Sequence, residues 1–363
     1  CSSYSSGSAD FTSLSSYNRT TIIVAVIGGL AVCIAAIISL GEPLVAKIVE
    51  IYFPGPTHTP TIVTYPQSLE STPTPKTFVT PTVTPSNTPQ ITPTPTLTAY
   101  PTSTPDPDVL PACLEVGQTW TSPVDKMKMV CVPKGGFLMG SNDEDRSAKD
   151  NEKPQHTVYL DAYWIDQTEV TNAQYAQCVE SGACSLSGRS ASQSFPDYYG
   201  NQLYDNYPAI FVTFQDAVDY CTWAERTLPT EAQWEKAARG TDGRIFPWGN
   251  NQPDNTRLNY SRYLGDVTAV GSYPSGISPY GALDMAGNAL EWTTDRYHQD
   301  YYSLYTSWLN PQGPKSGDYR VQRGGCWDSG PWSVRTTMRV PSSPNFRALF
   351  VGFRCALADS PSK

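Results

Sequence analysis

A long apolar stretch comes first in the pattern of hydrophobic and polar positions. Residues 20–41, TTIIVAVIGGLAVCIAAIISLG, carry no charged side chain between Arg19 and Glu42. Because an α-helix rises about 1.5 Å per residue, this stretch is long enough to cross a lipid bilayer. It is longer than the apolar core of a secretory signal peptide. We therefore predict a short polar segment at residues 1–19, then a transmembrane helix with a juxtamembrane extension at residues 20–53.

The charges around this stretch bear on its orientation. Arg19 precedes it and Lys47 follows it, so the positive-inside rule favours a cytoplasmic N-terminus only weakly. Cys1 leaves open a second arrangement, in which a lipidated N-terminal cysteine lies outside and the chain after the helix lies inside. The cysteines of the C-terminal region favour the first arrangement, for the reason given below.

A Thr-Pro repeat follows the apolar stretch, and we assign residues 54–109 to it. Its core reads TPTPKTFVTPTVTPSNTPQITPTPTLTAYPTSTP. Proline fixes φ and lacks a backbone donor, so this segment cannot bury a core and is expected to be polyproline-like. At about 3.1 Å per residue it would reach on the order of 160 Å. It would serve as a stalk or as a segment that wraps a partner protein.

Helical spacing of apolar residues appears only in short stretches of residues 110–363. TEVTNAQYAQCVES begins at the N-cap candidate Thr171, and TFQDAVDYCTWAER begins at Thr213. TEAQWEKAARG carries a capping box from Thr230 and stops at Gly240. The remainder predicts short strands and long loops, which need disulfides or bound ions to hold them in place. We therefore expect an α+β domain with little regular secondary structure.

The composition of the chain excludes a nucleic-acid-binding surface and a zinc site. The formal net charge is −9 at pH 7 and the pI is near 4.9, so no basic surface is available for a nucleic-acid backbone. The chain has nine cysteines but no C-x-x-C pair, and only three histidines. A zinc ribbon or a His-based zinc site is therefore excluded, and we expect no nucleic-acid partner.

A series of motifs runs in a fixed order through residues 110–363. They are GGFLMG at 135–140, EKPQHTVYL at 152–160, DQTEVTNAQYAQCV at 166–179, YCTWAERTLPTEAQWEKAARG at 220–240, FPWGN at 246–250, SPYGALDMAGNALEW at 278–292, YRVQRGGCW at 319–327 and VGFRCA at 351–356. With these motifs, the region resembles the formylglycine-generating enzyme (sulfatase-modifying factor) family. The resemblance implies a variant C-type-lectin-like fold of the mixed α+β class, ordered by calcium and disulfides.

The resemblance also implies a catalytic copper site, and the residues for it are missing here. Active members carry two copper-binding cysteines after the R-G-G-S-W motif, whereas the matching positions are Ser329 and either Ser333 or Val334. A hydroxyl is a poor ligand for Cu(I). We therefore expect no copper and assign no catalytic residue. Cys326, just before Trp327, is interpreted as a small buried residue, with a displaced redox thiol or a disulfide as alternatives.

An iron-dependent branch of the family takes its ligands from a separate helical domain with a His/Glu cluster. Residues 1–110 contain a single histidine, His58, within the Thr-Pro segment. We therefore expect no iron site of that kind.

Calcium is the cofactor that the resemblance favours. Oxygen ligands from a tight glycine-containing turn suit this hard cation. The alternative is that the side chains only cap local backbone. The positions that the resemblance implies are Asp284, Gly287, Ala289 and Glu291 for one site, and Asn259, Tyr260, Asp266 and Thr268 for a second.

Six cysteines are expected to form three bridges. The resemblance implies a disulfide between Cys221 and Cys355. The four other cysteines suit Cys178 with Cys184 and Cys113 with Cys131. Three bridges indicate an oxidising compartment. We therefore expect the C-terminal domain to lie on the extracytoplasmic side of the cytoplasmic membrane.

Three functions fit these observations. The favoured one is a non-catalytic accessory or structural subunit of a membrane protein complex, such as one of respiratory or photosynthetic electron transfer. Its partners would be integral membrane protein subunits and the lipid bilayer. The second is an oxidase that modifies a protein cysteine. The third is a calcium-dependent lectin-like module that uses the rings of YHQDYYSLYTSW, residues 297–308, unless those rings belong to the core.

Overall fold

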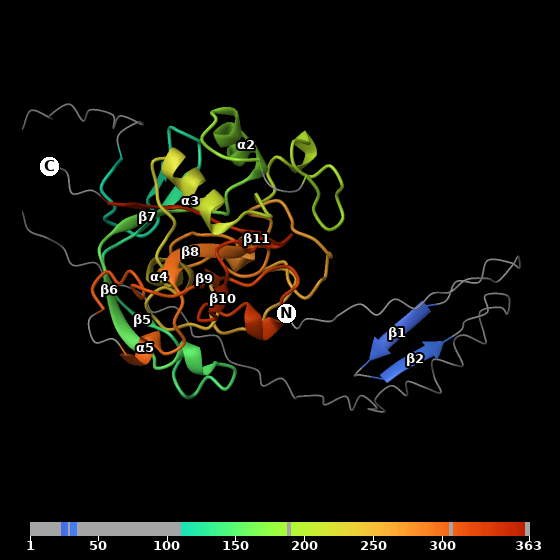
Figure 1. Ribbon diagram of the computed structural model, residues 1–363. Helices are drawn as coiled ribbons and strands as arrows, with labels where there is room; N and C mark the ends of the chain where they lie inside the picture. Colours follow the sequence, from blue (N-terminus) through green and yellow to red (C-terminus); the bar gives the residue numbers. More distant parts are fainter. Residues whose placement is uncertain (1–22, 28–29, 35–109, 187–189, 305–307, 360–363) are drawn as a thin grey trace, which may run out of the picture. The chain divides into compact units, whose positions relative to one another are not determined.

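The computed structural model describes residues 23–27, 30–34, 110–186, 190–304 and 308–359. The chain divides into two compact units, Cys1–Thr96 and Leu97–Lys363. The first unit contains β1 (Ile23–Ile27) and β2 (Leu30–Ile34), which pair as an antiparallel hairpin (Figure 1). The second unit contains every other described element.

The hairpin differs from the helix predicted over the same residues. Ile and Val dominate β1 and also occur in β2, and β-branched side chains favour extended backbone. Two glycines between apolar runs are also typical of a hairpin. Within the described ranges no helix is both long and apolar enough to span a membrane. The other residues of the predicted span and the whole segment 54–109 lie outside those ranges, so the anchor and the linker stay predictions.

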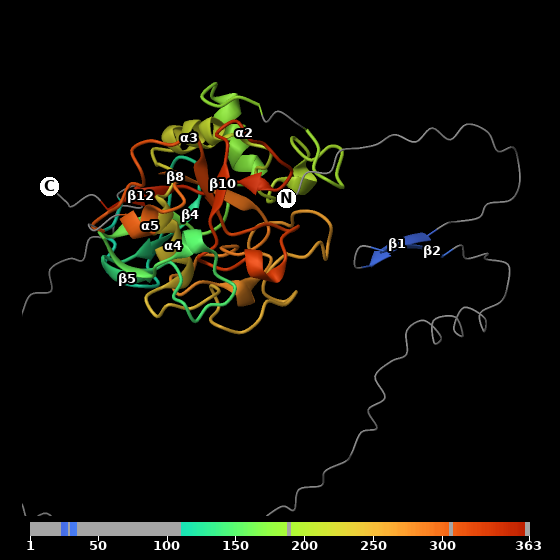
Figure 2. The same cartoon turned by 60° about the horizontal axis from the view of Figure 1, so that its bottom comes forward.

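Two four-stranded sheets form the centre of the second unit (Figures 1 and 2). One sheet is wholly antiparallel, in the order β12-β7-β4-β3. The other has the order β10-β9-β8-β11, with β11 parallel to β8. A separate hairpin is made of β5 and β6. The bounds are β3 Thr119–Thr121, β4 Lys128–Val132, β5 Gly135–Met139, β6 His156–Leu160, β7 Tyr163–Asp166, β8 Leu290–Arg296, β9 Arg320–Arg323, β10 Val340–Ser342, β11 Val351–Gly352 and β12 Ala356–Ala358.

The helices begin where their caps predict. Thr171, Thr213 and Thr230 are the N-caps of α2 (Asn172–Glu180), α3 (Phe214–Trp223) and α4 (Glu231–Arg239), each with a capping box. Gly240 ends α4 with φ of 71°, a left-handed conformation that favours glycine. In Figures 1 and 2, α2 and α3 lie together, whereas α4 packs against β5, β8 and β9. The one-turn elements are α5 Tyr301–Leu304 and the 3₁₀ helices η1 Asp150–Glu152, η2 Gln202–Tyr204, η3 Pro274–Gly276 and η4 Pro331–Ser333.

Three disulfides cross-link the second unit. They join the pairs expected from the sequence, Cys113–Cys131, Cys178–Cys184 and Cys221–Cys355. The last closes a sequence separation of 134 residues and ties α3 to the chain just before β12. The mixed helix and strand content, with most of the unit in loops, confirms the expected α+β class.

Candidate functional site

The loop after β9 occupies the place where the resemblance puts catalytic copper. Gly324 and Gly325 both have positive φ, 93° and 72°, and a Cβ at Gly325 would lie 2.6 Å from the Ser333 carbonyl oxygen. The tight turn brings Cys326 against Ser329, with 3.0 Å from the Cys326 amide nitrogen to Ser329 Oγ and 3.4 Å from Cys326 Sγ. Burial raises the pKa of the Cys326 thiol, so the group stays a neutral thiol near pH 7.

The second copper position is still less suited to metal chemistry. Val334 is fully buried in an apolar cluster with Phe246 and Leu258. Ser333 ends η4, where its amide donates to the Gly330 carbonyl over 2.9 Å. The residues present therefore do not fit a pair of copper thiolates, because Ser329 and either Ser333 or Val334 stand where two sulfur ligands are needed.

A pocket of about 490 Å³ opens beside this loop. Its apolar lining comes from Trp327, Leu349 and Phe350. Arg262 and Asp328 also line it and form an ion pair, with 3.0 Å from Arg262 Nη2 to Asp328 Oδ2. The Arg262 side chain is 72% exposed, so the pair lies at the mouth of the pocket rather than inside the core.

The backbone of Arg262 is held in an unusual conformation. Ser261 and Arg262 have φ of 53° and 58°, which few residues other than glycine adopt. Their amides donate to the Ser329 and Trp327 carbonyls over 2.9 and 2.8 Å. These bonds fasten the loop to the rim of the pocket. Sequence reasoning missed Arg262 because neither a motif nor a periodic pattern marks this loop.

The first expected calcium set is brought together around a buried arginine. Asp284, at φ of 56°, accepts from the Gly271 amide over 2.6 Å. Both oxygens of Glu291 accept from Arg354 over 2.7 Å, and one also accepts from the Trp234 indole over 2.7 Å. Glu291 therefore belongs to a satisfied ion pair and has little capacity left for a cation.

Glu169 is an acidic residue of this cluster that sequence reasoning missed. Its Oε1 accepts from Asn288 over 2.9 Å, whereas its Oε2 is buried without a hydrogen-bond partner among the described residues. Burial, followed by the charges of Asp284 and Glu291, raises the pKa of Glu169 well above its ordinary value. Burial likewise raises the pKa of Asp284. The cluster thus holds more buried carboxylate than Arg354 alone can neutralise.

This excess of buried negative charge raises the question of whether the cluster could hold a calcium ion. Across the described ranges, no three His, Cys, Asp or Glu side chains converge as a metal-binding group. A site that draws two ligands from the Gly287 and Ala289 carbonyls needs fewer carboxylates, and Ca²⁺ accepts such mixed oxygen sets. The orphaned oxygen of Glu169 fits a cation beside Asp284, with Glu291 in a supporting role.

The second expected set forms a hydrogen-bonded network next to the first. Asn259 donates to the Asp266 carbonyl over 2.8 Å, and its Oδ1 is buried without a partner among the described residues. The Asp266 carboxylate instead accepts from Ser192 and the Ser194 amide over 2.6 and 2.7 Å. The Asp266 side chain is therefore already satisfied, which fits a cation less well than the first set does.

Tyr260 and Thr268 are the other two residues of the second expected set. The ligand expected from Tyr260 is its backbone carbonyl, which accepts from the Tyr263 amide over 3.1 Å, while its hydroxyl donates to the Pro253 carbonyl over 2.9 Å. The Thr268 amide donates to Asn288 Oδ1 over 2.9 Å, and Asn288 also contacts Glu169. The Asn288 side chain thus links Thr268 of the second expected set to Glu169, the residue that sequence reasoning missed.

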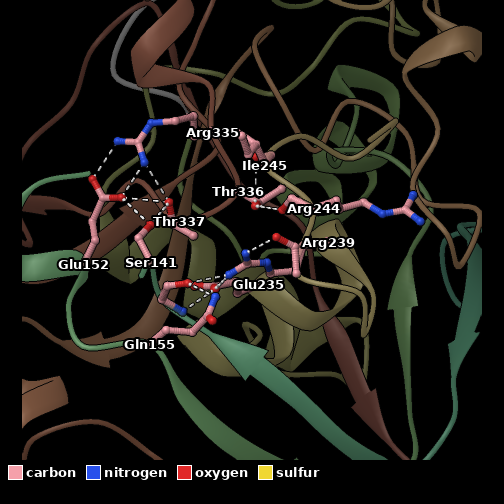
Figure 3. A network of polar contacts seen from close by, with 12 residues as sticks. Ser141, Glu152, Gln155, Glu235, Arg239, Arg244, Ile245, Arg335, Thr336 and Thr337 are labelled. Atoms are coloured by element: carbon pink, nitrogen blue, oxygen red, sulfur yellow. Dashed lines mark hydrogen bonds and ion pairs between the residues drawn. The ribbon is translucent and has the colours of Figure 1, made fainter. Parts of the chain in front are cut away.

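Figure 3 shows a buried polar network that the sequence did not predict. The Arg335 guanidinium donates two hydrogen bonds to the Glu152 carboxylate, of 2.6 and 2.8 Å, and Thr337 donates to the same carboxylate over 2.7 Å. Burial would raise the pKa of Glu152, but the bonds and charge of Arg335 lower it below its ordinary value. Arg239 contacts Glu235 over 2.8 Å nearby. All these groups neutralise one another, so we interpret the network as a scaffold that holds the chain after the rim.

Three rings of the aromatic segment at residues 297–308 belong to the core, which is one of the two alternatives expected for them. Tyr301 and Tyr302 are buried in a core cluster, and Trp308 packs partly buried against it. The His156 ring lies 4.6 Å from Tyr302 and 4.0 Å from Trp308, measured between ring centroids. Tyr301 and Tyr302 are therefore not available as a ligand-binding surface.

Comparison with known proteins agrees with the motifs. A family model described as Sulfatase-modifying factor enzyme 1-like domain matches residues 117–359. The formylglycine-generating enzyme of Bos taurus is 31% identical over 291 residues, which cover 66% of this chain and 77% of that enzyme. The serine/threonine-protein kinase pkn1 of Chlamydia caviae is 34% identical over 251 residues, which cover 63% of this chain and only 38% of the kinase.

A solved structure shows the same fold. PvdO from Pseudomonas aeruginosa superposes with a TM-score of 0.58 at 24% identity, over 67% of this chain and 99% of PvdO. The family model covers more than half of the chain, and it spans both the rim after β9 and the acidic cluster around Arg354. The chain therefore belongs to the sulfatase-modifying factor family, whose domain it carries in residues 117–359.

Proposed function

We propose that this protein is a membrane-anchored, extracytoplasmic and non-catalytic member of the family, which acts as an accessory or structural subunit of a membrane protein complex. Residues 20–53 would hold it in the lipid bilayer, and residues 54–109 would form the arm between bilayer and domain. Its partners would be integral membrane protein subunits, including those of respiratory or photosynthetic electron transfer. The three disulfides support an oxidising compartment for the domain.

One observation carries the non-catalytic part of the proposal. Ser329 and either Ser333 or the buried Val334 stand where the resemblance implies two copper thiolates, and Cys326 is a buried thiol whose pKa is raised. A neutral thiol without a neighbouring base is a poor nucleophile and a poor metal ligand. The rim therefore keeps the shape of an active site without its reactive groups.

The pocket beside the rim supports the binding part of the proposal. Its lining combines the aromatic rings of Trp327 and Phe350 with the exposed guanidinium of Arg262. Aromatic residues and arginine are enriched in protein interfaces, where they supply most of the binding energy. We assign the docking of a partner subunit to this pocket.

Extraction of native membranes in a mild detergent tests the proposal. Mass spectrometry of the species that migrates at native size should find the protein in fixed stoichiometry with integral membrane subunits. Recovery of the protein alone, in a single monodisperse species, would contradict the subunit role. Copper titration of that preparation would then test the oxidase alternative, and a glycan array would test the lectin alternative.

A single substitution tests the pocket. Arg262→Glu reverses an exposed charge at its mouth and should release the partner during extraction, with an unchanged melting temperature. Lys153→Glu is the matched control, because Lys153 also forms a surface ion pair, with Asp143, but does not line this pocket. Equal retention of the partner by both variants would place the interface elsewhere.

We also propose a structural calcium ion at the first acidic cluster. Bound calcium would neutralise the carboxylates of Asp284 and Glu169 and hold the Gly287 turn. Ligands that bind only the folded state raise its stability, so removal of calcium should lower the melting temperature by several degrees. Glu169→Gln should reduce that response, and an unchanged melting temperature with chelator would argue against the ion.

A further inference from the structure

A polar pocket of about 240 Å³ opens next to the buried network of Figure 3. The buried residues Ser141 and Thr337 of that network line it, together with exposed residues of the loops after β5 and α4. Among the described residues, its lining shares no member with the pocket beside the rim or with either expected calcium set. It is therefore a separate candidate site.

A buried arginine holds the two loops of this pocket together. Arg239 Nη1 donates to the Gly140 carbonyl over 2.7 Å, and its Nη2 donates to the Gly243 carbonyl over 2.8 Å. Gly140 has φ of 81°, and a Cβ there would lie 2.6 Å from the Glu152 carbonyl oxygen. These contacts fix the two walls relative to each other, which lowers the conformational cost of binding a ligand between them.

Two side-chain amides of the lining present donors. Asn142 Oδ1 accepts from the Glu144 and Asp145 amides over 3.1 and 3.2 Å. Asn250 Oδ1 accepts from the Ile245 amide over 2.9 Å. Because a backbone amide can only donate, each side-chain oxygen faces its amide, and each NH₂ group has no partner among the described residues. The pocket thus offers two neutral hydrogen-bond donors.

The charged groups of the lining do not favour an ionic ligand. Arg239 is the only cation of the described lining, and it is 3% exposed and paired with Glu235 over 2.8 Å, so a phosphate or carboxylate finds no free positive charge. Asp145 is likewise paired, with Arg335 over 3.1 Å. The exposed carboxylate of Glu144 remains, and one exposed charge contributes little to the binding of a cation. The lining therefore suits a neutral ligand.

Hydroxyl groups match the remaining polar atoms. Gln155 Nε2 donates to the Gly140 carbonyl over 3.2 Å, which leaves Gln155 Oε1 as an acceptor in the same pocket as the two NH₂ groups. A hydroxyl both donates and accepts, so a ligand that carries several hydroxyls can pair with both kinds of group. Ile245 is the one large apolar side chain of the described lining, which is too little apolar surface for a hydrophobic ligand.

We propose that this pocket binds a neutral, hydroxyl-rich ligand of the size of one sugar residue, without calcium. The hydroxyls of the ligand accept from the NH₂ groups of Asn142 and Asn250 and donate to Gln155 Oε1. The pocket is smaller than the roughly 300–1,000 Å³ of pockets for drug-sized ligands, so it fits one sugar residue rather than an oligosaccharide. For so few atoms we expect a dissociation constant on the order of 1 mM. This inference depends neither on the membrane anchor nor on a partner subunit.

Saturation-transfer NMR on the full chain, in a detergent without a sugar headgroup, tests the proposal. The probes are glucose, galactose, mannose and N-acetylglucosamine, each as the free sugar and as its methyl glycoside. Transfer to at least one of them should persist in the presence of EGTA, because no expected calcium ligand lines the pocket. Transfer to the methyl glycosides would identify the end of a glycan as the ligand, and transfer to the free sugars alone would identify a soluble monosaccharide.

Two isosteric substitutions locate the site. In Asn250→Asp the new carboxylate still accepts from the Ile245 amide but no longer donates, so sugar binding should weaken at least about tenfold while the melting temperature stays nearly unchanged. Asn142→Asp should act in the same way. Asn201→Asp is the matched control, because Asn201 Oδ1 also accepts from a backbone amide, that of Leu203 over 3.0 Å, but does not line this pocket.

Three results would overturn the proposal. One is the absence of saturation transfer to every sugar of the set at concentrations well above the expected dissociation constant. Another is equal sugar binding by Asn250→Asp, Asn142→Asp and the control, since the sugar would then occupy another surface. The third is loss of the transfer in EGTA, which would assign the binding to a calcium site.

Discussion

Ser329 lies in contact with the buried thiol of Cys326 in the turn after β9. Its hydroxyl oxygen lies 3.4 Å from Cys326 Sγ, so the turn places this position and Cys326 in contact. A thiol in place of the hydroxyl would put two sulfur atoms within reach of one ion. The turn therefore brings these two positions close together, although the side chains present offer a single sulfur.

Ser329→Cys should consequently create a Cu(I) site. We expect stoichiometric Cu(I) binding in competition with a chromophoric chelator, because two thiolates suit this soft ion, and no such binding by the natural protein. The double variant Cys326→Ser/Ser329→Cys leaves a single sulfur and should lose the site. Equal Cu(I) affinity of the natural protein and Ser329→Cys would show that the two side chains do not converge.

Asp295 is a second residue whose surroundings predict a measurable effect. It is fully buried beside Glu231, and its carboxylate accepts a hydrogen bond from the Glu231 amide over 2.7 Å. Burial, followed by the charge of Glu231, raises the pKa of Asp295 to about 7. The unfolded value is about 3.9, so between these two values the folded state binds the extra proton. Stability from this group is therefore present at low pH and is lost as pH rises from about 4 to about 7.

Asp295→Asn should remove this loss of stability at rising pH. Between pH 5 and pH 8 the unfolding free energy of the natural protein should fall by roughly 2–3 kcal/mol relative to that of the variant. Denaturant unfolding at the two pH values provides the measurement, with Asp300→Asn as an exposed control. Parallel pH profiles for the natural protein and Asp295→Asn would mean that Asp295 is ionised throughout.

At the scale of elements, local sequence signals decide where helices start. The capping boxes of α2, α3 and α4 need only residues within one turn, so they can be recognised without the fold. The hairpin of β1 and β2 shows the opposite case. An apolar run with paired glycines suits a membrane helix and a hairpin alike, and periodicity alone does not distinguish them.

Thr230→Ala tests the contribution of one cap. Loss of the bond from the Gln233 amide to Thr230 Oγ1, 3.1 Å long, should lower the unfolding free energy by about 1 kcal/mol. Thr222→Ala serves as control, because Thr222 is exposed near the end of α3 and caps no helix. An effect of Thr230→Ala no larger than that of the control would show that the buried contacts of α4 position it without the cap.

At the scale of the whole molecule, long-range links hold the loops together. Arg335 and Glu152 are 183 residues apart in the sequence, and Cys221 and Cys355 are 134 apart. Such links are needed because most of the domain is loop, whose backbone gains little from regular hydrogen bonding. A link that closes a longer loop removes more entropy from the unfolded chain.

The loss of unfolding free energy on removal of a disulfide should be larger for the bridge that closes the longer loop. Replacement of Cys221 and Cys355 by alanine should lower the unfolding free energy by roughly 4–5 kcal/mol, and replacement of Cys178 and Cys184 by roughly 2–3 kcal/mol. Denaturant unfolding under non-reducing conditions gives both values. The reverse order would mean that local packing near Cys178, rather than loop closure, dominates.

By itself, the sequence determined the family, the α+β class, the starts of the three main helices and the expected disulfide pairs. Motifs, caps and cysteine spacing are local or ordered along the chain, so they can be read without coordinates. Only the tertiary structure decided that Glu291 pairs with Arg354, that Glu169 joins Asp284, and that Arg262 stands at the mouth of a pocket. Those contacts depend on how distant loops pack, and no periodicity or motif records them.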